Sequence, residues 1–108
     1  MEVYLTDGTL PTYFDNGKKS GEVTYKNSKP HGLWTEWYES GQLKSEKRYK
    51  DGKRHGKCIG WHENGLMFKE SFYKNGKAEG THMTWNKDGT LIRKYIWKDN
   101  KLDGDQIQ

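Results

Sequence analysis

The residues that could act in acid–base, nucleophilic or metal chemistry are few, and most belong to a repeating pattern. One polar slot recurs every 24 residues and holds His31, His55, Glu79 and Asp103. Its variety predicts polar turn residues rather than a catalytic base. Cys58, His62 and His82 supply neither a C-x-x-C nor an H-x-x-x-H spacing for zinc. The sequence therefore predicts no catalytic residue, no metal site and no cofactor.

Three glutamates also share the 24-residue spacing: Glu22, Glu46 and Glu70. Hydrolysis by paired carboxylates needs a separation of about 5–10 Å, which a hairpin translation of about 9.6 Å could supply. Lys94 breaks this column, and lysines and arginines surround it. We interpret the glutamates as cross-strand partners of cationic side chains, and we predict that the chain is not an enzyme.

Anion binding is the other chemistry that the sequence offers. Cationic side chains are concentrated in residues 44–57, where the candidates are Lys44, Lys47, Arg48, Lys53, Arg54 and Lys57. The whole chain has a net charge of +4. Interleaved aromatic residues would let such a stretch contact nucleic acid, and its charge would also suit phospholipid headgroups. The alternative is an ordinary solvated strand face whose lysines discourage edge-to-edge aggregation.

The elements that must position these residues follow the same 24-residue period. Glycines fall on one grid at Gly8, Gly32, Gly56, Gly80 and Gly104. Aromatic residues fill two further columns, Tyr13, Trp37, Trp61 and Trp85, and Tyr25, Tyr49, Tyr73 and Trp97. A fixed period of this length indicates stacked supersecondary units. We predict one domain over residues 1–108, with repeats at 8–31, 32–55, 56–79 and 80–103.

Each repeat is predicted to be a β-hairpin. Asn64-Gly65 and Asp88-Gly89 stand between alternating runs, and such pairs favour hairpin turns because they tolerate positive φ. A second turn, such as Asp51-Gly52, follows each hairpin. Turns therefore arrive about every 12 residues, which leaves no room for a long helix. The predicted fold class is all-β: an elongated antiparallel β-meander of four 24-residue hairpin repeats in a single-layer twisted sheet.

The hairpin register decides which side chains share a face. A three-residue loop ending in a left-handed glycine would pair Trp37 with Leu43, whereas a two-residue loop would pair Tyr38 with Leu43. We prefer the first register because it aligns the tryptophan and aliphatic columns in one row. This choice also predicts Tyr49 on the same face as Trp37.

The composition limits the core and the compartment. Only 31% of the residues are hydrophobic and 31% are charged, so the aromatic residues, 14% of the chain, must supply most of the packing. No run approaches the roughly 20 apolar residues that span a bilayer, and the N-terminal residues lack a basic start followed by an apolar run. Cys58 is the single cysteine. We expect a cytoplasmic protein.

Four segments carry a family resemblance: WYESGQLKSEKRYKDGKRHG, WHENGLMFKESFYKNGKAEG, WNKDGTLIRKYIWKDNKLDG and the weaker YFDNGKKSGEVTYKNSKPHG. Each combines an aromatic residue, a turn of the Asn-Gly type and a second aromatic residue. This pattern resembles the MORN repeat family, and more closely its bacterial variant in YwqK-like antitoxin proteins. The resemblance implies a hairpin array for protein contacts, with toxin neutralisation or immunity in some relatives and proposed phospholipid contact in some eukaryotic ones. The first segment departs at Lys19, where the others have Leu or Met, and at Ser28, where a turn glycine is expected.

Three functions follow as hypotheses. The first is a non-enzymatic protein-binding module, an antitoxin, immunity protein or other inhibitor from a bacterium or phage that covers a toxin, effector or enzyme. Its candidate contact residues are Trp34, Tyr38, Phe68 and Phe72. The second is an anionic-surface binder that uses residues 44–57, and the third is a structural scaffold or a phage-encoded inhibitor of a host defence system. Open sheet edges near Tyr4 and Tyr95 would also allow a homodimer.

Overall fold

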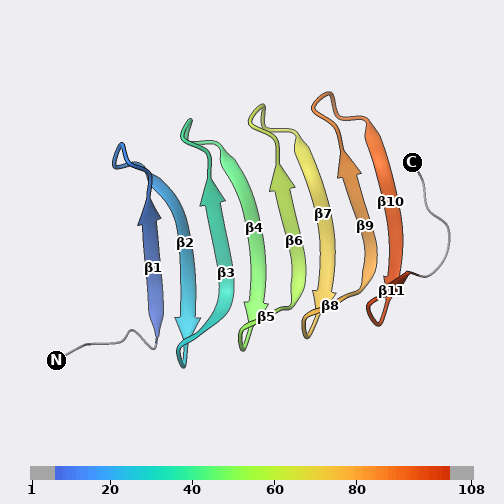
Figure 1. Ribbon diagram of the computed structural model, residues 1–108, viewed down its shortest axis with the longest axis horizontal. Helices are drawn as coiled ribbons and strands as arrows, with labels where there is room; N and C mark the ends of the chain where they lie inside the picture. Colours follow the sequence, from blue (N-terminus) through green and yellow to red (C-terminus); the bar gives the residue numbers. More distant parts are fainter. Residues whose placement is uncertain (1–6, 103–108) are drawn as a thin grey trace.

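A computed structural model describes residues 7–102, which form strands and turns in one open antiparallel sheet (Figure 1). This arrangement confirms the predicted all-β meander. No helix of the described residues is long and apolar enough to cross a membrane. Tyr4, Asp103 and Gly104, which the sequence patterns included, lie outside the described residues.

The strands follow one another across the sheet in chain order. They are β1 (Gly8–Tyr13), β2 (Lys19–Lys26), β3 (Lys29–Trp37), β4 (Leu43–Lys50), β5 (Lys53–Arg54), β6 (Gly56–Trp61), β7 (Met67–Lys74), β8 (Lys77–Ala78), β9 (Gly80–Trp85), β10 (Leu91–Lys98) and β11 (Lys101–Leu102). The short strands β5 and β8 pair with β4 and β7. They begin the segments that continue as β6 and β9, so each repeat is one hairpin of two long strands.

The hairpin loops confirm the preferred register. In the second repeat the Tyr38 N–H donates to the Gln42 carbonyl and the Gly41 N–H donates to the Tyr38 carbonyl, both at 2.9 Å. Gly41 has a φ of +92°, a conformation that glycine adopts at little cost. Trp37 therefore lies opposite Leu43. The equivalent pairs are Trp61 with Met67 and Trp85 with Leu91.

A β-bulge beside each loop changes which residues share a face. Lys44 has no partner of its own on β3, because Trp37 pairs with Leu43 and the preceding residue of β3 pairs with Ser45. The extra residue reverses the alternation of faces along the rest of β4. The ring of Tyr49 consequently lies 5.7 Å from that of Trp34. The prediction that Tyr49 shares a face with Trp37 is wrong.

The two faces of the sheet can now be defined. We call one the tryptophan face, and its main row is Trp37, Leu43, Trp61, Met67, Trp85 and Leu91. We call the other the tyrosine face, and it carries Tyr25, Trp34, Lys47, Tyr49, Cys58, Ser71, Tyr73, His82 and Trp97. The register shift recurs in the other repeats, so the separation holds along the whole sheet.

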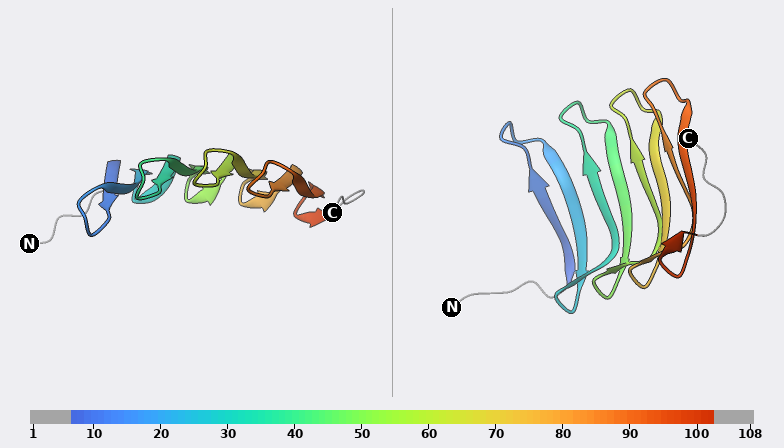
Figure 2. Two further views of the ribbon diagram at one scale, coloured as in Figure 1. Left: turned by 90° about the horizontal axis from the view of Figure 1, so that it is seen from above. Right: turned by 45° about the vertical axis from the view of Figure 1, so that its right-hand side comes forward.

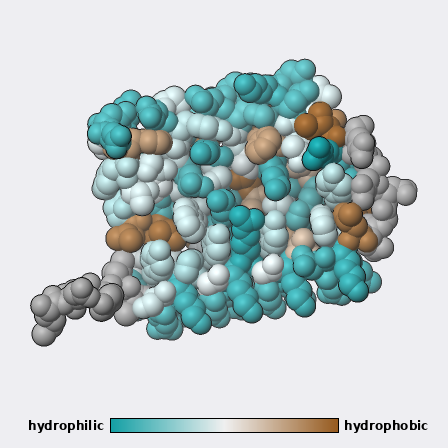
Figure 3. Space-filling view, in the orientation of Figure 1, coloured by the Kyte–Doolittle hydropathy of each residue, from teal (hydrophilic) through white to brown (hydrophobic). Residues whose placement is uncertain are grey.

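The sheet is a single layer with little buried material. Its shortest dimension is 14 Å, and the views in Figure 2 show one row of strands that bend along their length. Among the described residues, the buried apolar side chains are Val23, Cys58 and Ala78, and the buried polar ones are Thr35, Ser71 and His82. The surface seen in Figure 3 is mostly hydrophilic, with small separate apolar patches. Stability must therefore come from many cross-strand contacts rather than from a thick core.

The turns between repeats are tight and are fastened to the preceding repeat. Asp51 and Gly52 have φ values of +50° and +82°, as a two-residue turn of type I′ requires. The Asp51 N–H donates to Nδ1 of His31 at 3.3 Å, and the Gly52 N–H donates to the Pro30 carbonyl at 2.9 Å. His55 holds the next turn in the same way at Asn75. His31, His55 and Glu79 of the polar slot thus have a structural role: each accepts a hydrogen bond from the turn of the following repeat rather than lying in a turn itself.

Candidate functional site

An open groove lies on the tyrosine face, where β4, β6 and β7 lie side by side. Its volume is about 260 Å³. Cys58 and Gly60 come from β6, and Ser45 and Ser71 come from the strands on either side. Because these residues are small, they form the floor of the groove, and longer side chains form its rim.

The groove exists because the third repeat breaks two columns of the 24-residue pattern. Cys58 occupies the slot that holds Trp34 in the second repeat and His82 in the fourth. Gly60 occupies the slot of Glu36 and Thr84. In the third repeat, smaller residues thus stand at two successive positions of this face of β6, which opens space on that face.

Two aromatic residues stand at the groove. Tyr38 donates a hydrogen bond from its hydroxyl to the Trp61 carbonyl at 2.7 Å, and the Lys44 ammonium lies 5.7 Å from its ring centroid. Phe68 is the extra residue of the bulge in β7, and its side chain is 43% exposed. Its ring also contacts His62, with the centroids 5.0 Å apart. One aromatic residue is thus held in place and the other offers apolar surface to solvent.

The groove has a positive charge. Lys44, Lys47, Arg54 and Lys69 line it, and Glu36 is the carboxylate among its described lining residues. The Ser45 hydroxyl donates to Glu36 at 2.9 Å, and the Lys47 ammonium lies 3.2 Å from the same carboxylate. Burial raises the pKa of Glu36, but these two groups lower it by more, so the pKa lies below its ordinary value. Glu36 therefore stays ionised and neutralises only part of the charge.

A smaller hollow of about 170 Å³ lies next to the groove, toward the first repeat. Glu36 and Lys44 line both hollows. Val23 and Trp34 line the second one, which gives it apolar surface. The two hollows together follow the tyrosine face across the strands, rather than along one of them.

The structure brings together most of the predicted contact residues and separates the others. Tyr38, Phe68, Lys44, Lys47 and Arg54 line the groove, and Trp34 lies on the same face with the Lys47 ammonium 5.5 Å from its ring centroid. The tryptophan face carries Phe72, Arg48 and Lys57, and Lys57 is 3.5 Å from Glu70. Lys53 lies beside a turn. Residues 44–57 therefore do not form one continuous basic surface.

Sequence reasoning missed the floor of the groove. Cys58, Gly60 and Ser71 carry no obvious binding chemistry, so a search for reactive or large side chains passes over them. The detectable signal was the loss of Trp or His from a column that is otherwise large in the neighbouring repeats.

No group of three or more His, Cys, Asp or Glu side chains in residues 7–102 is arranged to hold a metal ion. Cys58 is a buried free thiol, 6% exposed, and it lies opposite Ser71. The groove therefore offers aromatic surface, ammonium groups and one guanidinium group. Such groups bind a ligand through apolar contacts and electrostatic attraction.

Comparison with known proteins agrees with the hairpin architecture. The MORN repeat variant family matches residues 6–27, 30–51 and 54–75. The fourth hairpin, β9 with β10, lies outside these matches and continues the same sheet. No curated protein matches the chain. MORN repeats are non-catalytic repeat modules that generally bind proteins or membranes. Because the three matches cover more than half of the sequence, this chain belongs to the MORN repeat variant family.

Proposed function

We propose that the chain is a non-enzymatic module that binds a partner protein through the tyrosine face, and that it acts as an antitoxin, immunity protein or other inhibitor. The groove beside Tyr38 and Phe68 is the observation that carries this proposal. It combines an exposed aromatic side chain with a polar and cationic rim, which is the composition of a protein-binding hot spot.

The size and charge of the groove favour one kind of occupant. At about 260 Å³ it is smaller than most small-molecule pockets, which enclose about 300–1,000 Å³. An anchoring side chain of a partner fits this scale better than a whole ligand. The charges of Lys44, Lys69 and Arg54 favour an acidic residue next to that anchor. We therefore expect a partner segment that carries an aromatic or aliphatic side chain beside an Asp or Glu.

A variant that fills the groove tests the proposal. Gly60→Thr introduces the residue that the fourth repeat has at the same slot, Thr84. A Cβ at Gly60 would lie 3.5 Å from Phe68 Cδ2 and 3.7 Å from the Lys44 carbonyl, which are ordinary contacts. The backbone has no positive φ there. The sheet should therefore fold normally with a narrower groove.

The experiment compares this variant with a control on the opposite face. The parent chain, Gly60→Thr and Phe72→Leu are used as baits for proteins of the source cell, and each retained protein is then titrated against the three purified chains. We expect Gly60→Thr to weaken binding by at least about tenfold, because a hot-spot contact contributes about 2 kcal/mol or more. Phe72→Leu should bind like the parent. The reverse result would place the partner on the tryptophan face.

The inhibitory role needs its own readout. The retained partner is assayed for its own activity with and without the parent chain. Inhibition that Gly60→Thr relieves would support an inhibitor or antitoxin. A partner that binds at the groove and keeps its full activity would instead indicate a scaffold.

A further inference from the structure

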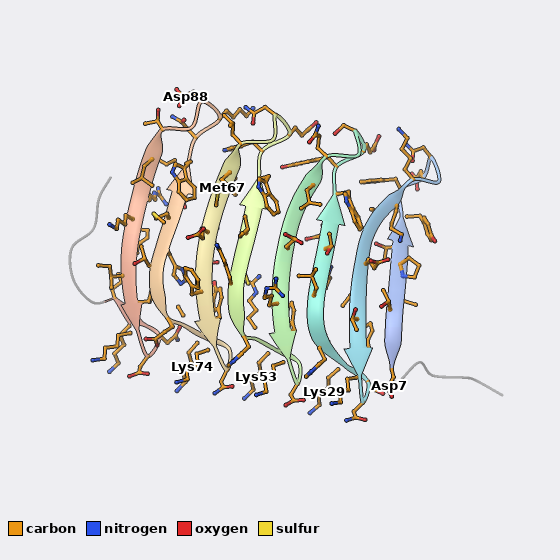
Figure 4. The ribbon with its side chains drawn as sticks, turned by 180° about the vertical axis from the view of Figure 1, so that it is seen from behind. Asp7, Lys29, Lys53, Met67, Lys74 and Asp88 are labelled. Carbon is orange, nitrogen blue, oxygen red and sulfur yellow. The ribbon has the colours of Figure 1, made fainter. Side chains whose placement is uncertain are left out.

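A row of lysines lies along one side of the sheet, at the strand ends where the turns between repeats are, and away from the groove. Each turn between repeats is flanked by two lysines at directly opposite positions: Lys26 and Lys29, Lys50 and Lys53, Lys74 and Lys77, Lys98 and Lys101. All eight are exposed. An antiparallel meander returns to the same edge at every second turn, so residues far apart in sequence are collected there. Figure 4 shows Lys29, Lys53 and Lys74 along this edge and Asp88 at the opposite one. We call this row the lysine edge.

The charge of the lysine edge is not balanced locally. Within residues 7–102, no carboxylate forms an ion pair with any of the eight ammonium groups. The acidic residues in these turns are Asp51 and Asp99, and Asp7 and Glu79 accept hydrogen bonds from the backbone of the first and last turns, so four carboxylates face eight lysines. Like charges directly opposite each other destabilise a sheet. The row therefore opposes folding stability, and its charge is available to a ligand.

Two of the lysine stems, those of Lys29 and Lys53, pack at equivalent positions of successive repeats. Side-chain carbons of Lys29 lie 3.6–3.8 Å from the position that a Cβ of Gly52 would occupy, and those of Lys53 lie 3.7–3.8 Å from the equivalent position at Gly76. Each of these stems thus crosses the turn of the following repeat. The glycine leaves room for it, and the pairs repeat at the spacing of the hairpins, about 9.6 Å.

The opposite edge of the sheet differs in charge. Its hairpin loops carry four acidic residues and two lysines: Asp15, Glu39, Glu63 and Asp88 with Lys18 and Lys87. The positive charge is therefore a property of the lysine edge and not of the turns in general.

We propose that the lysine edge binds the phosphate backbone of single-stranded nucleic acid. Four lysine pairs at about 9.6 Å spacing extend over roughly 29 Å, which suits a linear polyanion. An aromatic residue precedes the first lysine of each pair: Tyr25, Tyr49, Tyr73 and Trp97. These rings are half-buried and lie on the tyrosine face. Aromatic rings beside a basic track are the usual means of stacking unpaired bases.

The composition of the turns favours single-stranded nucleic acid over a lipid bilayer as the ligand. The residues at the tips are Asn27, Ser28, Asp51, Gly52, Asn75, Gly76, Asp99 and Asn100. None of these side chains is apolar or aromatic, so the tips have nothing to insert into the membrane interface. The aromatic residues lie next to the lysines on the tyrosine face, where the bases of a bound nucleic-acid strand would contact them. None of the eight lysines lines the groove, but the aromatic residues share its face, and the guanidinium of Arg54, which lines the groove, lies 5.1 Å from the ring centroid of Tyr73.

Salt-dependent binding to a labelled oligothymidylate of about 15 nucleotides tests the proposal. Fluorescence anisotropy is measured with the full chain between about 25 and 200 mM salt. In the edge variant, Lys50, Lys53, Lys74 and Lys77 are replaced by glutamine. In the control, which has the same net charge, Lys18, Lys57, Lys87 and Lys94 are replaced by glutamine; these residues lie on the opposite loops and the tryptophan face. Circular dichroism confirms that both variants fold.

We expect the edge variant to lose affinity by at least about tenfold and the salt slope of log Kd to fall by up to about 2.8, since each neutralised phosphate of a single strand contributes about 0.7. The control should keep the parent slope within about one unit. Tyr49→Leu with Tyr73→Leu should weaken binding while leaving the slope unchanged, because stacking does not release counterions.

Four outcomes would overturn the proposal. The parent chain could fail to bind the oligonucleotide at the lowest salt, or both charge variants could lose equal affinity, which would show a response to net charge alone. Edge-dependent binding to vesicles with about 30% anionic lipid, without oligonucleotide binding, would assign the lysine edge to membranes. Unchanged affinity of the double leucine variant would remove the stacking role and leave a surface for any polyanion.

Discussion

The Tyr38 hydroxyl donates a 2.7 Å hydrogen bond to the backbone carbonyl of Trp61, and this bond joins the second repeat to the third. His62 stands 24 residues after Tyr38, and its Nε2 lies 2.9 Å from the carbonyl of Trp85. Phe14 occupies the same slot in the first repeat and has no polar group for such a bond. Neighbouring repeats are therefore connected at their loop ends by side chains as well as by the strand ladder.

Replacing Tyr38 by phenylalanine keeps the ring and removes this bond. We expect the free energy of unfolding to fall by about 0.5–1.5 kcal/mol, the usual net contribution of one hydrogen bond. Urea denaturation provides the measurement. Tyr13→Phe serves as the control, because Tyr13 is 61% exposed. Equal midpoints for Tyr38→Phe and the parent would mean that water replaces the bond without loss.

Ser28 adopts a φ of +66° in the first turn between repeats, where Gly52 and Gly76 have +82° and +84°. A left-handed conformation costs an L-residue about 1–2 kcal/mol, and glycine avoids most of this cost while losing some chain entropy. We expect Ser28→Gly to raise the unfolding free energy by about 0.5–1 kcal/mol. Gly52→Ser should lower it by a similar amount. A scan of melting temperatures checks both signs, and shifts in the same direction would contradict the explanation.

Nδ1 of His55 accepts a hydrogen bond from the Asn75 N–H at 3.1 Å, and a carboxylate oxygen of Glu79 accepts the equivalent bond from the Asp99 N–H at 3.2 Å. We expect His55→Ala to lower the free energy of unfolding by about 0.5–1.5 kcal/mol, the usual net contribution of one hydrogen bond. His55→Glu should retain most of it. Amide hydrogen exchange at Asn75 gives a local readout. The two variants exchanging alike would show that this bond does not hold the turn.

The carboxyl of Glu36 is expected to make stability depend on pH. Its pKa in the folded chain lies below the ordinary value of 4.5, because the Ser45 hydroxyl and the Lys47 ammonium favour the charged form more than burial opposes it. Ionised Glu36 therefore stabilises the fold above the unfolded-state pKa, and this contribution is lost as the pH falls through the lower folded-state pKa.

Denaturation at pH 7 and at about pH 3 tests this dependence. The stability difference between the parent and Glu36→Gln should shrink as the pH falls. Glu63→Gln, at an exposed loop position, should track the parent at both pH values. If the stability difference between the parent and Glu36→Gln were the same at both pH values, the charge of Glu36 would not be the cause of that difference.

Lys50 and Lys53 lie directly opposite each other across a turn. Lys50→Glu converts a like-charge pair into an attractive one, so we expect the unfolding free energy to rise by about 0.2–1 kcal/mol. The gain should shrink at about 1 M salt because exposed charges are screened. Destabilisation at low salt would mean that the lysine pair is not repulsive.

Much of the fold was predictable because it rests on local chemistry. The 24-residue period identified the repeats, and the turn at Ser40-Gly41 predicted a loop whose glycine has positive φ. That loop then determined the pairing of Trp37 with Leu43. These features depend on neighbouring residues, so they can be read directly from the sequence.

The candidate site was only partly predictable. The sequence indicated Tyr38, Phe68 and the lysines near them, since large and charged side chains are natural contact residues. The sequence did not indicate that these residues share a groove with Cys58 and Gly60, which are small and carry no obvious binding group. A groove forms where small residues of neighbouring strands lie side by side. The pairing of those strands must therefore be known before a small residue can be recognised as part of a groove.

The sequence by itself determined the hairpin repeats, their turns and the column of lysines after the aromatic residues. Only the tertiary structure decided the faces and the edges. The bulge at Lys44 moved Tyr49 away from Trp37, because a single unpaired residue reverses the side-chain alternation of everything that follows it. The meander then carried lysines from four turns to one edge, because antiparallel strands return to the same side at every second turn. A side chain's face and edge are properties of strand pairing, which depends on the whole sheet.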